Sequence, residues 1–354
     1  MQLTDPAHNG RIRSVFLPAV LCCAKSDAPA VVFLHRQEVI CMSISASIGR
    51  RHRGSRRGMK RSTRETLFFY VCISPWIIGF VVFTAVPMFS SLYLSFTDWD
   101  SFQKPNWVGL GNYAKALTAD PLFWKVLRNT FYYAIVSVPV SLLIALYLSN
   151  LLSHDFRGKR IYRTIIYLPS LVPLVAAGLI FKWLLKPEDG PVNALLGLFG
   201  IKGPAWLLDA NWVIPAIILL SIWQVGGGTI LLISAINGVP KELYEAAEID
   251  GAGHYRLFWS ITFPMITPIL FFNLVTGIIG AFQVFDQVYI LTQGGPDNAS
   301  QMMVPYIYTS AFKDFHMGYA SALAWMLFVI IMVISAAVLK SSDAWVFYES
   351  EVKK

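Results

Sequence analysis

The chain has 354 residues, of which 55% are hydrophobic and 14% are charged, and its formal net charge is +8 at pH 7. Ordinary soluble domains carry about 25% charged residues, so this composition excludes a soluble globular protein of this size. The positive charge is concentrated in short segments between apolar runs, which indicates membrane topology and not a nucleic-acid surface.

The first part of the chain, residues 1–58, does not fit the pattern of the rest. Residues 15–23 form a short apolar run that is superficially similar to a signal peptide, but cleavage there would leave the basic cluster at 50–64 on the outer side. We therefore expect either a basic leader without defined structure or sequence upstream of a true start at Met59. Of the four cysteines, only Cys72 lies beyond this segment, and their spacing predicts neither a disulfide framework nor a metal site.

Six later stretches are long enough to cross a membrane, which takes about 20 mostly apolar residues. They are residues 67–89, 129–151, 165–185, 213–236, 269–291 and 319–339. Lys and Arg gather before the first stretch, in the loop after the second and in the tail, all of which lie on one side of the membrane if each stretch crosses it. The loop after the fourth stretch lies on that side too and carries two more basic residues. Because basic residues accumulate on the cytoplasmic side, the sequence predicts an all-α integral membrane protein with six spans and both termini in the cytoplasm.

The predicted outer loops combine turn-forming and aromatic residues. Between the first two spans, Gly109 and Gly111 suit tight turns, and their neighbours Trp107 and Tyr113 suit the membrane interface. Between the third and fourth spans, residues 192–199 predict a short interfacial helix.

An acidic segment in the predicted cytoplasmic loop 238–266 predicts a helix that a partner could bind. Pro240 suits a helix start, and Glu242 and Glu245 lie near the positive end of the helix dipole. Gly251, after Asp250, suits a helix stop with positive φ. Helices that lie on a membrane prefer Lys and Arg on their polar face, so the acidic character favours a protein partner.

Polar side chains inside spans usually face the bundle interior or a watery cavity. We interpret five residues of the fourth and fifth spans as candidates for a translocation path: Trp223, Gln224, Asn273, Gln283 and Asp286. Gln224 and Gln283 can both donate and accept hydrogen bonds, and Trp223 could stack on a sugar ring. Helix packing is the alternative role for Gln224, and Asp286 could instead lie near the outer interface.

Several of these segments resemble one known family. The motif Glu245-Ala246-Ala247, followed by Asp250-Gly251-Ala252, Phe258, Ile261, Pro264 and Pro268, is similar to the EAA motif of the membrane subunits of binding-protein-dependent ABC importers. More narrowly, the chain resembles carbohydrate-uptake permeases of the maltose and glycerol-phosphate type, and Gly294-Gly295-Pro296 is similar to the first permease of the maltose type. The resemblance covers roughly residues 66–340.

The resemblance implies a permease subunit that imports a sugar or related polyol across the cytoplasmic membrane. Its coupling residues would be Glu245, Ala246, Ala247, Asp250 and Gly251, which would dock on a separate ATPase subunit. The other implied partners are a second permease, forming a heterodimer, and an extracytoplasmic solute-binding protein. The chain has no phosphate-binding loop of its own, so we predict no catalytic residues, no cofactor and no enzymatic activity.

The predicted organisation is a leader over 1–58, a six-span domain over 59–341 and a cytoplasmic tail over 342–354. Two other functions remain open. A secondary transporter driven by an ion gradient would need ionisable residues deep in several spans and broken helices. A non-transporting scaffold or sensor would use the acidic helix to bind a regulator. Mono- and oligosaccharides, polyols and glycerol phosphate all remain possible solutes.

Overall fold

The structure, a computed structural model, describes residues 61–347, with side chains from Glu65 onward. The predicted leader, with Met59 and all cysteines except Cys72, lies outside the described residues. The chain divides into two units, Met1–Ile73 and Ser74–Lys354, and each is described by itself. Helix α2 (Arg61–Phe80) begins in the first unit, where the apolar side chains of Leu67, Phe68 and Phe69 are exposed.

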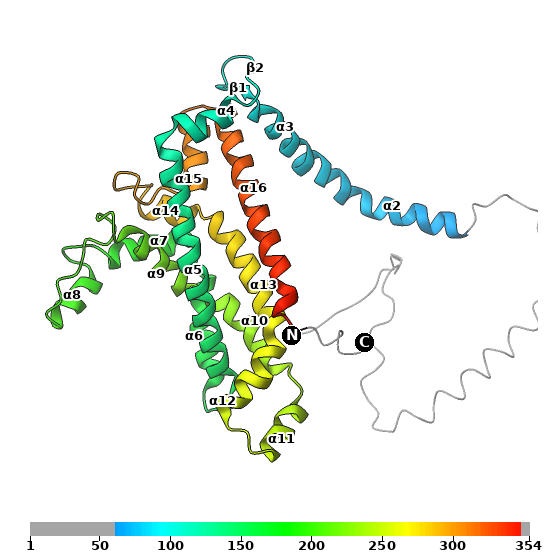
Figure 1. Cartoon of the computed structure of the whole chain (residues 1–354), viewed down its shortest axis with the longest axis vertical. Coiled ribbons are helices and arrows are strands. Elements are labelled where there is room, and N and C mark those ends of the chain that lie inside the picture. The colour runs from blue at the N-terminus through cyan, green and yellow to red at the C-terminus, as the bar shows by residue number, and fades with distance from the viewer. Residues whose placement is uncertain (1–60, 348–354) are drawn as a thin grey trace, which may run out of the picture. The chain divides into compact units, whose positions relative to one another are not determined.

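The described elements are almost all helical (Figure 1). After α2 come the π-helical turn η1 (Val81–Ala85), α3 (Val86–Ser95), strands β1 (Thr97–Asp98) and β2 (Asn106–Trp107), α4 (Gly111–Ala114), η2 (Lys115–Ala119), α5 (Pro121–Ser153), α6 (Lys159–Leu171), α7 (Leu174–Leu184) and α8 (Pro191–Leu198). There follow α9 (Val213–Trp223), α10 (Gly226–Asn237), α11 (Lys241–Ile249), α12 (His254–Leu257), η3 (Phe258–Thr262), α13 (Phe263–Phe282), α14 (Asp286–Leu291), α15 (Met303–Tyr308), η4 (Thr309–Lys313), α16 (Met317–Ser341) and the 3₁₀ turn η5 (Ser342–Ala344).

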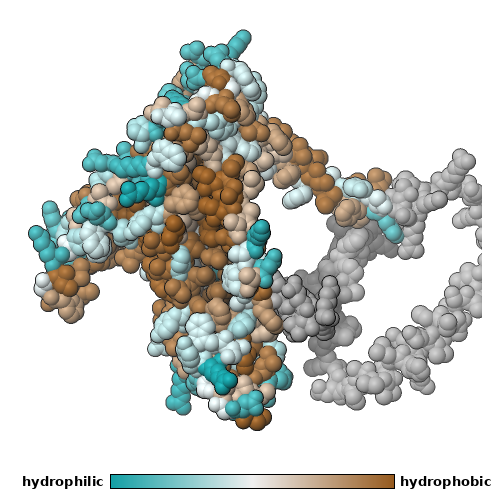
Figure 2. All heavy atoms as spheres, in the orientation of Figure 1, coloured by the Kyte–Doolittle hydropathy of each residue, from teal (hydrophilic) through white to brown (hydrophobic). Residues whose placement is uncertain are grey.

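Four segments within residues 61–347 are long and apolar enough to cross a membrane: Glu65–Ser95, Pro121–Ser153, His254–Phe282 and Met317–Ala344. Two pairs of helices also qualify if each bent pair is one span: α6 with α7, bent by 97°, and α9 with α10, bent by 45°. Figure 2 shows hydrophobic residues gathered over the middle of the helical bundle, and hydrophilic residues near the β1–β2 hairpin and around α11. This distribution is typical of a helical membrane protein.

The fifth predicted span, 269–291, is wrong at both ends. The helix begins at His254 and runs through η3 and α13 to Phe282, and a break then separates it from α14. The predicted span joined α13 to α14 because the apolar residues of α13 and of 288–291 outweigh the polar Gln283, Asp286 and Gln287 between them. Only residues 238–253 of the predicted loop 238–266 therefore lie outside the long helix.

The predicted tail is ordered in its first part. The backbone N–H of Phe347 donates a hydrogen bond to the Thr267 hydroxyl at 2.9 Å. The ring of Trp345 packs on Phe271, with centroids 5.7 Å apart. The start of the tail thus folds back onto α13.

Helix α5 is the central element of the second unit, because it packs against α9, α10 and α13. The core beside it contains fully buried large side chains such as Phe123, Ile217 and Leu323. Its N-terminus is capped by Asp120, whose carboxylate accepts hydrogen bonds from the backbone N–H groups of Leu122 and Phe123, an arrangement that satisfies otherwise unpaired helix donors.

The Asp120 carboxylate also joins three elements. Its Oδ2 atom accepts hydrogen bonds from the hydroxyls of Tyr306 on α15 and Tyr319 on α16, each at 2.5 Å. Burial would raise the pKa of Asp120, but these two hydroxyls and the capping N–H groups outweigh it and lower the pKa below the ordinary 3.8. Asp120 therefore holds the starts of α5 and α16 and the short helix α15 together.

The two bent pairs meet at a glycine. Helix α10 packs against α6, and a Cβ atom on Gly226 would lie only 2.3 Å from the carbonyl oxygen of Ile166 and 2.9 Å from Cα of Tyr167. A Cβ atom on the next glycine, Gly227, would meet nothing within 4 Å. Of these two positions, only 226 requires the absence of a side chain.

Candidate translocation cavity and coupling helix

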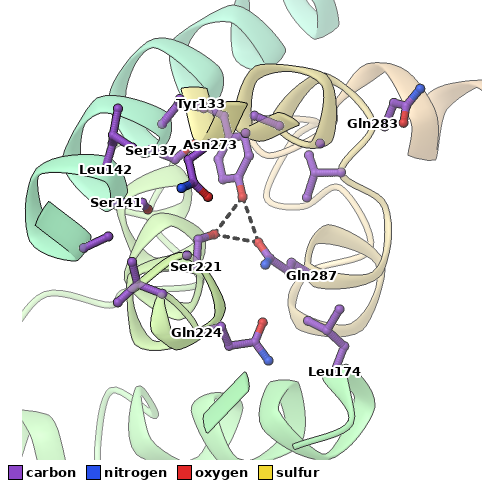
Figure 3. Close-up of a pocket in the computed structure, with 18 of the residues that line it drawn as sticks. Tyr133, Ser137, Ser141, Leu142, Leu174, Ser221, Gln224, Asn273, Gln283 and Gln287 are labelled. Atoms are coloured by element: carbon purple, nitrogen blue, oxygen red, sulfur yellow. Dashed lines mark hydrogen bonds between the residues drawn. The ribbon is translucent and has the colours of Figure 1, made fainter. Parts of the chain in front are cut away.

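A cavity of about 430 Å³ lies where α5, α9, α10, α13 and α14 converge, with Leu174 at the start of α7. Its polar wall includes Tyr133, Ser137 and Ser141 from α5 and Ser221 from α9 (Figure 3). Both bent pairs therefore contribute to the cavity near their bends.

Three side chains form a hydrogen-bonded group in the cavity wall. The hydroxyls of Tyr133 and Ser221 are 2.7 Å apart. Oε1 of Gln287 accepts from Tyr133 at 3.0 Å and from Ser221 at 2.9 Å (Figure 3). This group links α5, α9 and α14. It engages the amide oxygen of Gln287, whereas the NH₂ group of Gln287 makes no hydrogen bond to the other residues drawn.

Gln224 supplies a whole free amide, whereas Gln287 has only its NH₂ group available. Gln224 lies in the break between α9 and α10, lines the cavity, and makes no hydrogen bond to another residue drawn in Figure 3. Asn273 on α13 donates through Nδ2 to the carbonyl of Ile269 at 3.1 Å, which leaves its amide oxygen available. An amide can both donate and accept, so these groups can bind the hydroxyls of a solute.

The five path candidates differ in position. Gln224, Asn273, Gln283 and Asp286 all line the cavity. The labelled amide of Gln283 lies apart from the Tyr133–Ser221–Gln287 group and points away from it (Figure 3). Trp223 is not among the lining residues, and its ring packs on Phe181 with centroids 5.5 Å apart.

Sequence reasoning did not select Tyr133, Ser137, Ser141 or Gln287. The first three recur every fourth residue along the second predicted span, a spacing that places them on one helix face. That pattern was an available signal. Gln287 also lies in the fifth predicted span, 269–291, so the criterion that selected Gln283 and Asp286 applied to it as well.

Asp286 is the only ionisable carboxylate, and no Lys, Arg or His is present, among the described residues that line the cavity. It is the first residue of α14 and is exposed. Uncharged hydroxyl and amide groups therefore supply most of the polar surface of the cavity.

Helix α11 lies outside the bundle and has no buried residue. Glu245, Ala246 and Asp250 are exposed, Ala247 is half-buried, and Ile249 at the helix end is 87% exposed. A hydrogen bond of 2.9 Å between the hydroxyls of Tyr244 and Thr262 attaches this helix to the long helix that follows it.

The end of α11 confirms the expected stop at Gly251, whose φ is +78°. The N–H of Ala252 bonds the carbonyl of Ala247 at 2.9 Å, and the N–H of Gly251 bonds that of Glu248 at 3.0 Å. This pair of hydrogen bonds is the Schellman motif, which needs a left-handed residue at that position.

The long apolar helices, the polar cavity between them and the exposed helix α11 define a polytopic membrane permease. The chain belongs to the family of binding-protein-dependent transport system inner membrane components, whose model matches residues 137–343. Its curated relatives include sugar ABC transporter permeases, so the resemblance seen in the sequence is confirmed.

The chain is 40% identical over 299 residues to the probable ABC transporter permease protein YesP of Bacillus subtilis, covering 83% of this chain and 97% of YesP. It is 33% identical over 291 residues to the lactose transport system permease protein LacF of Rhizobium radiobacter, covering 78% and 96%. The fold is similar to that of a chain in the crystal structure of a bacterial alginate ABC transporter in complex with alginate pentasaccharide-bound periplasmic protein, with a TM-score of 0.72, 22% identity, and coverage of 80% of this chain and 96% of that chain.

Proposed function

We propose that the chain is the membrane-spanning subunit of an ABC importer that carries a sugar or related polyol across the cytoplasmic membrane. ATP is hydrolysed in a separate ATPase subunit that binds α11. A second, different permease subunit and an extracytoplasmic solute-binding protein complete the importer. In this arrangement the protein is a multi-pass membrane protein with six spans and both termini in the cytoplasm.

The observation that carries this proposal is the exposure of α11. A nine-residue helix with no buried residue gains little from packing on its own chain, although packing normally supplies most helical stability. Tyr244 attaches α11 to the long helix containing α13, and α11 has a defined end at Gly251. A displacement of α11 by a bound subunit would therefore move that long helix. Glu245, Ala246, Ala247, Asp250 and Gly251 are thus the proposed coupling residues.

The cavity supports the solute class. Sugars and polyols present many hydroxyls, and the free amide of Gln224, the NH₂ group of Gln287 and the amide oxygen of Asn273 match them. Gln283 and Asp286 remain candidates for the rim of the path, and Trp223 is assigned to packing against Phe181.

Purification of the tagged full chain from its own membranes tests the assembly. We expect an ATPase subunit and a second permease to co-purify, and sugar uptake into vesicles made with the complex to require ATP. Uptake that persists without ATP and stops when an ion gradient is collapsed would support a secondary transporter instead. A secondary transporter would also have broken helices at its solute site, and the two bent pairs at the cavity match that feature. A complex that moves no solute would support a scaffold or sensor.

Gly251→Ala tests the coupling role. At φ +78° an alanine costs about 1–2 kcal/mol, so the end of α11 should shift and the amount of solute moved per ATP should fall. Gly253→Ala is the matched control, since Gly253 has an extended backbone with φ −74° and ψ 164° and space for a Cβ atom. Equal transport per ATP in the two variants would contradict the coupling role.

Gln224→Ala tests solute binding in the cavity. Loss of one hydrogen bond of about 0.5–1.5 kcal/mol should raise the half-saturating concentration of the transported sugar roughly two- to tenfold. Gln283→Ala is the control, because its amide points away from the polar group, and it should change this concentration less. The assignment fails if Gln283→Ala has the larger effect in the same concentration series of vesicle uptake.

A further inference from the structure

The segment between α7 and α9 carries an apolar tip without a partner in the described chain. The tip consists of Leu195, Leu198, Phe199 and Ile201, at the end of α8 and just after it, and all four are exposed, Leu198 at 83% and Phe199 at 75%. In Figure 1, α8 projects away from the bundle, and Figure 2 shows hydrophobic residues at this end. We propose that this tip inserts into the lipid of the outer leaflet and anchors the outer ends of α7 and α9 to the membrane.

The tip is presented by a defined base. The side chain of Asn193 donates through Nδ2 to the carbonyls of Pro187 at 3.0 Å and Pro204 at 3.1 Å. Its Oδ1 accepts from Nε1 of Trp206 at 2.7 Å. These three hydrogen bonds join α8 to the chain before it, at Pro187, and to the chain after it, at Pro204 and Trp206. The fold therefore holds the apolar side chains of the tip outward.

The base is also closely packed. A Cβ atom on Gly203 would lie 2.1 Å from Oδ1 of Asn193, so the returning chain passes directly against this side chain. The ring of Trp206 meets that of Trp212 with centroids 5.3 Å apart, which continues the contact to the start of α9.

Lipid is the occupant that the surroundings of the tip favour. Residues 190–201 contain no charged side chain, whereas a protein interface usually has a polar rim with charged groups. The charges lie at the edge of the tip, where Lys202 follows Ile201 directly, and at the base, where Lys186 and Asp189 pair at 2.6 Å. An apolar face with charges confined to its edge is typical of a helix at a membrane surface.

The position of the tip supports the same occupant. Its segment connects α7 and α9, each of which is half of a bent helix pair that is long and apolar enough to be one span. The ends of the segment therefore lie where those spans leave the membrane. The exposed apolar side chains of α7, including Val175, Leu179 and Trp183, continue the apolar surface up to this segment. Helix α8 has eight residues and is about 12 Å long, too short to cross a bilayer of about 30 Å. The proposal requires a membrane-spanning chain and does not depend on the solute or on an ATPase.

Collision measurements on a spin label test the anchor. All four cysteines are replaced by serine in the full chain, which is purified with its co-purifying subunits and placed in phosphatidylcholine–phosphatidylglycerol nanodiscs. A label at Leu198→Cys should collide with dissolved oxygen, which concentrates in lipid, several-fold more than with a water-soluble nickel chelate. A label at Lys186→Cys, at the base, should show the reverse preference.

Each other outcome overturns the proposal. Preference for the nickel chelate at residue 198 would mean that the tip lies in water, and protection from both reagents would mean that a protein subunit covers it. Leu195→Cys provides the same measurement if the first labelled variant does not assemble. Failure of sugar uptake or of ATPase co-purification would leave these collision results unchanged, so the two proposals fail separately.

Discussion

Replacing Gly226 with alanine is expected to destabilise the protein and to abolish transport more completely than a substitution at any other glycine of the Gly226–Gly228 run. The new Cβ atom would lie 2.3 Å from the carbonyl oxygen of Ile166, and backbone cannot rotate away as a flexible side chain can. Overpacking in a dense interior costs about 1–3 kcal/mol, and here the strain falls on the contact between α6 and α10.

The displacement should reach the cavity, because Gln224 lies two residues before Gly226 and α6 leads into the bend before Leu174. Thermal unfolding of the detergent-purified complex and vesicle uptake measure the two effects. Gly227→Ala is the matched control, since its Cβ atom meets nothing within 4 Å, and it should retain near-normal values. Similar losses in both variants would contradict this explanation, because the loss of stability would then not depend on the close contact at Gly226.

Replacing Asp120 with alanine is expected to cause the second large loss of stability. The substitution removes a helix cap worth about 0.5–2 kcal/mol. It also leaves the buried hydroxyls of Tyr306 and Tyr319 without their acceptor, at about 1–3 kcal/mol each where no water replaces it. The starts of α5 and α16 would then separate more easily, and the unfolding temperature of the complex should fall.

Tyr306→Phe and Tyr319→Phe make the test specific. Each removes one donor without leaving an unpaired hydroxyl, so each should cost less than Asp120→Ala. In the Asp120→Ala background, each tyrosine substitution should have a smaller effect than in the unmodified chain, because the partner is already absent. Full additivity would contradict a shared network.

The same carboxylate predicts the direction of a pH effect. Its pKa is lowered in the folded protein, so the folded state holds fewer protons on Asp120 than the unfolded state does. The stabilisation is therefore fully present above the ordinary aspartate pKa of about 3.9 and is lost as the pH falls below it. The difference in unfolding temperature between the unmodified chain and Asp120→Asn should be constant near neutral pH and should shrink below about pH 4.

The stop of α11 could be predicted because it is a local property. Asp250-Gly251 after a run of helix formers specifies a helix end at short range, and the positive φ of Gly251 follows from the steric freedom of glycine. The apolar helices were predictable for a similar reason, since a long apolar stretch must be helical in lipid. The fifth span was misplaced because the three polar residues at the break, Gln283, Asp286 and Gln287, are outweighed by the apolar residues before and after them.

The composition of the cavity was only partly predictable. Gln224 and Asn273 were identifiable as polar residues inside apolar stretches, and both line the cavity. Tyr133 and Gln287, 154 residues apart, meet only because α5 packs beside the break before α14. The orientation that separates Gln224 from Gln283 likewise depends on the backbone at each helix end.

The sequence by itself determined the apolar helices and the stop of the acidic helix, because hydropathy and a local helix stop depend on neighbouring residues. The permease family followed from the resemblance of residues 245–268 to the EAA motif. Only the tertiary structure decided which polar side chains share one cavity, that Gly226 must lack a side chain while Gly227 need not, and that the α8 tip is held outward by Asn193. These properties depend on distances between segments far apart in the chain, and packing alone sets those distances.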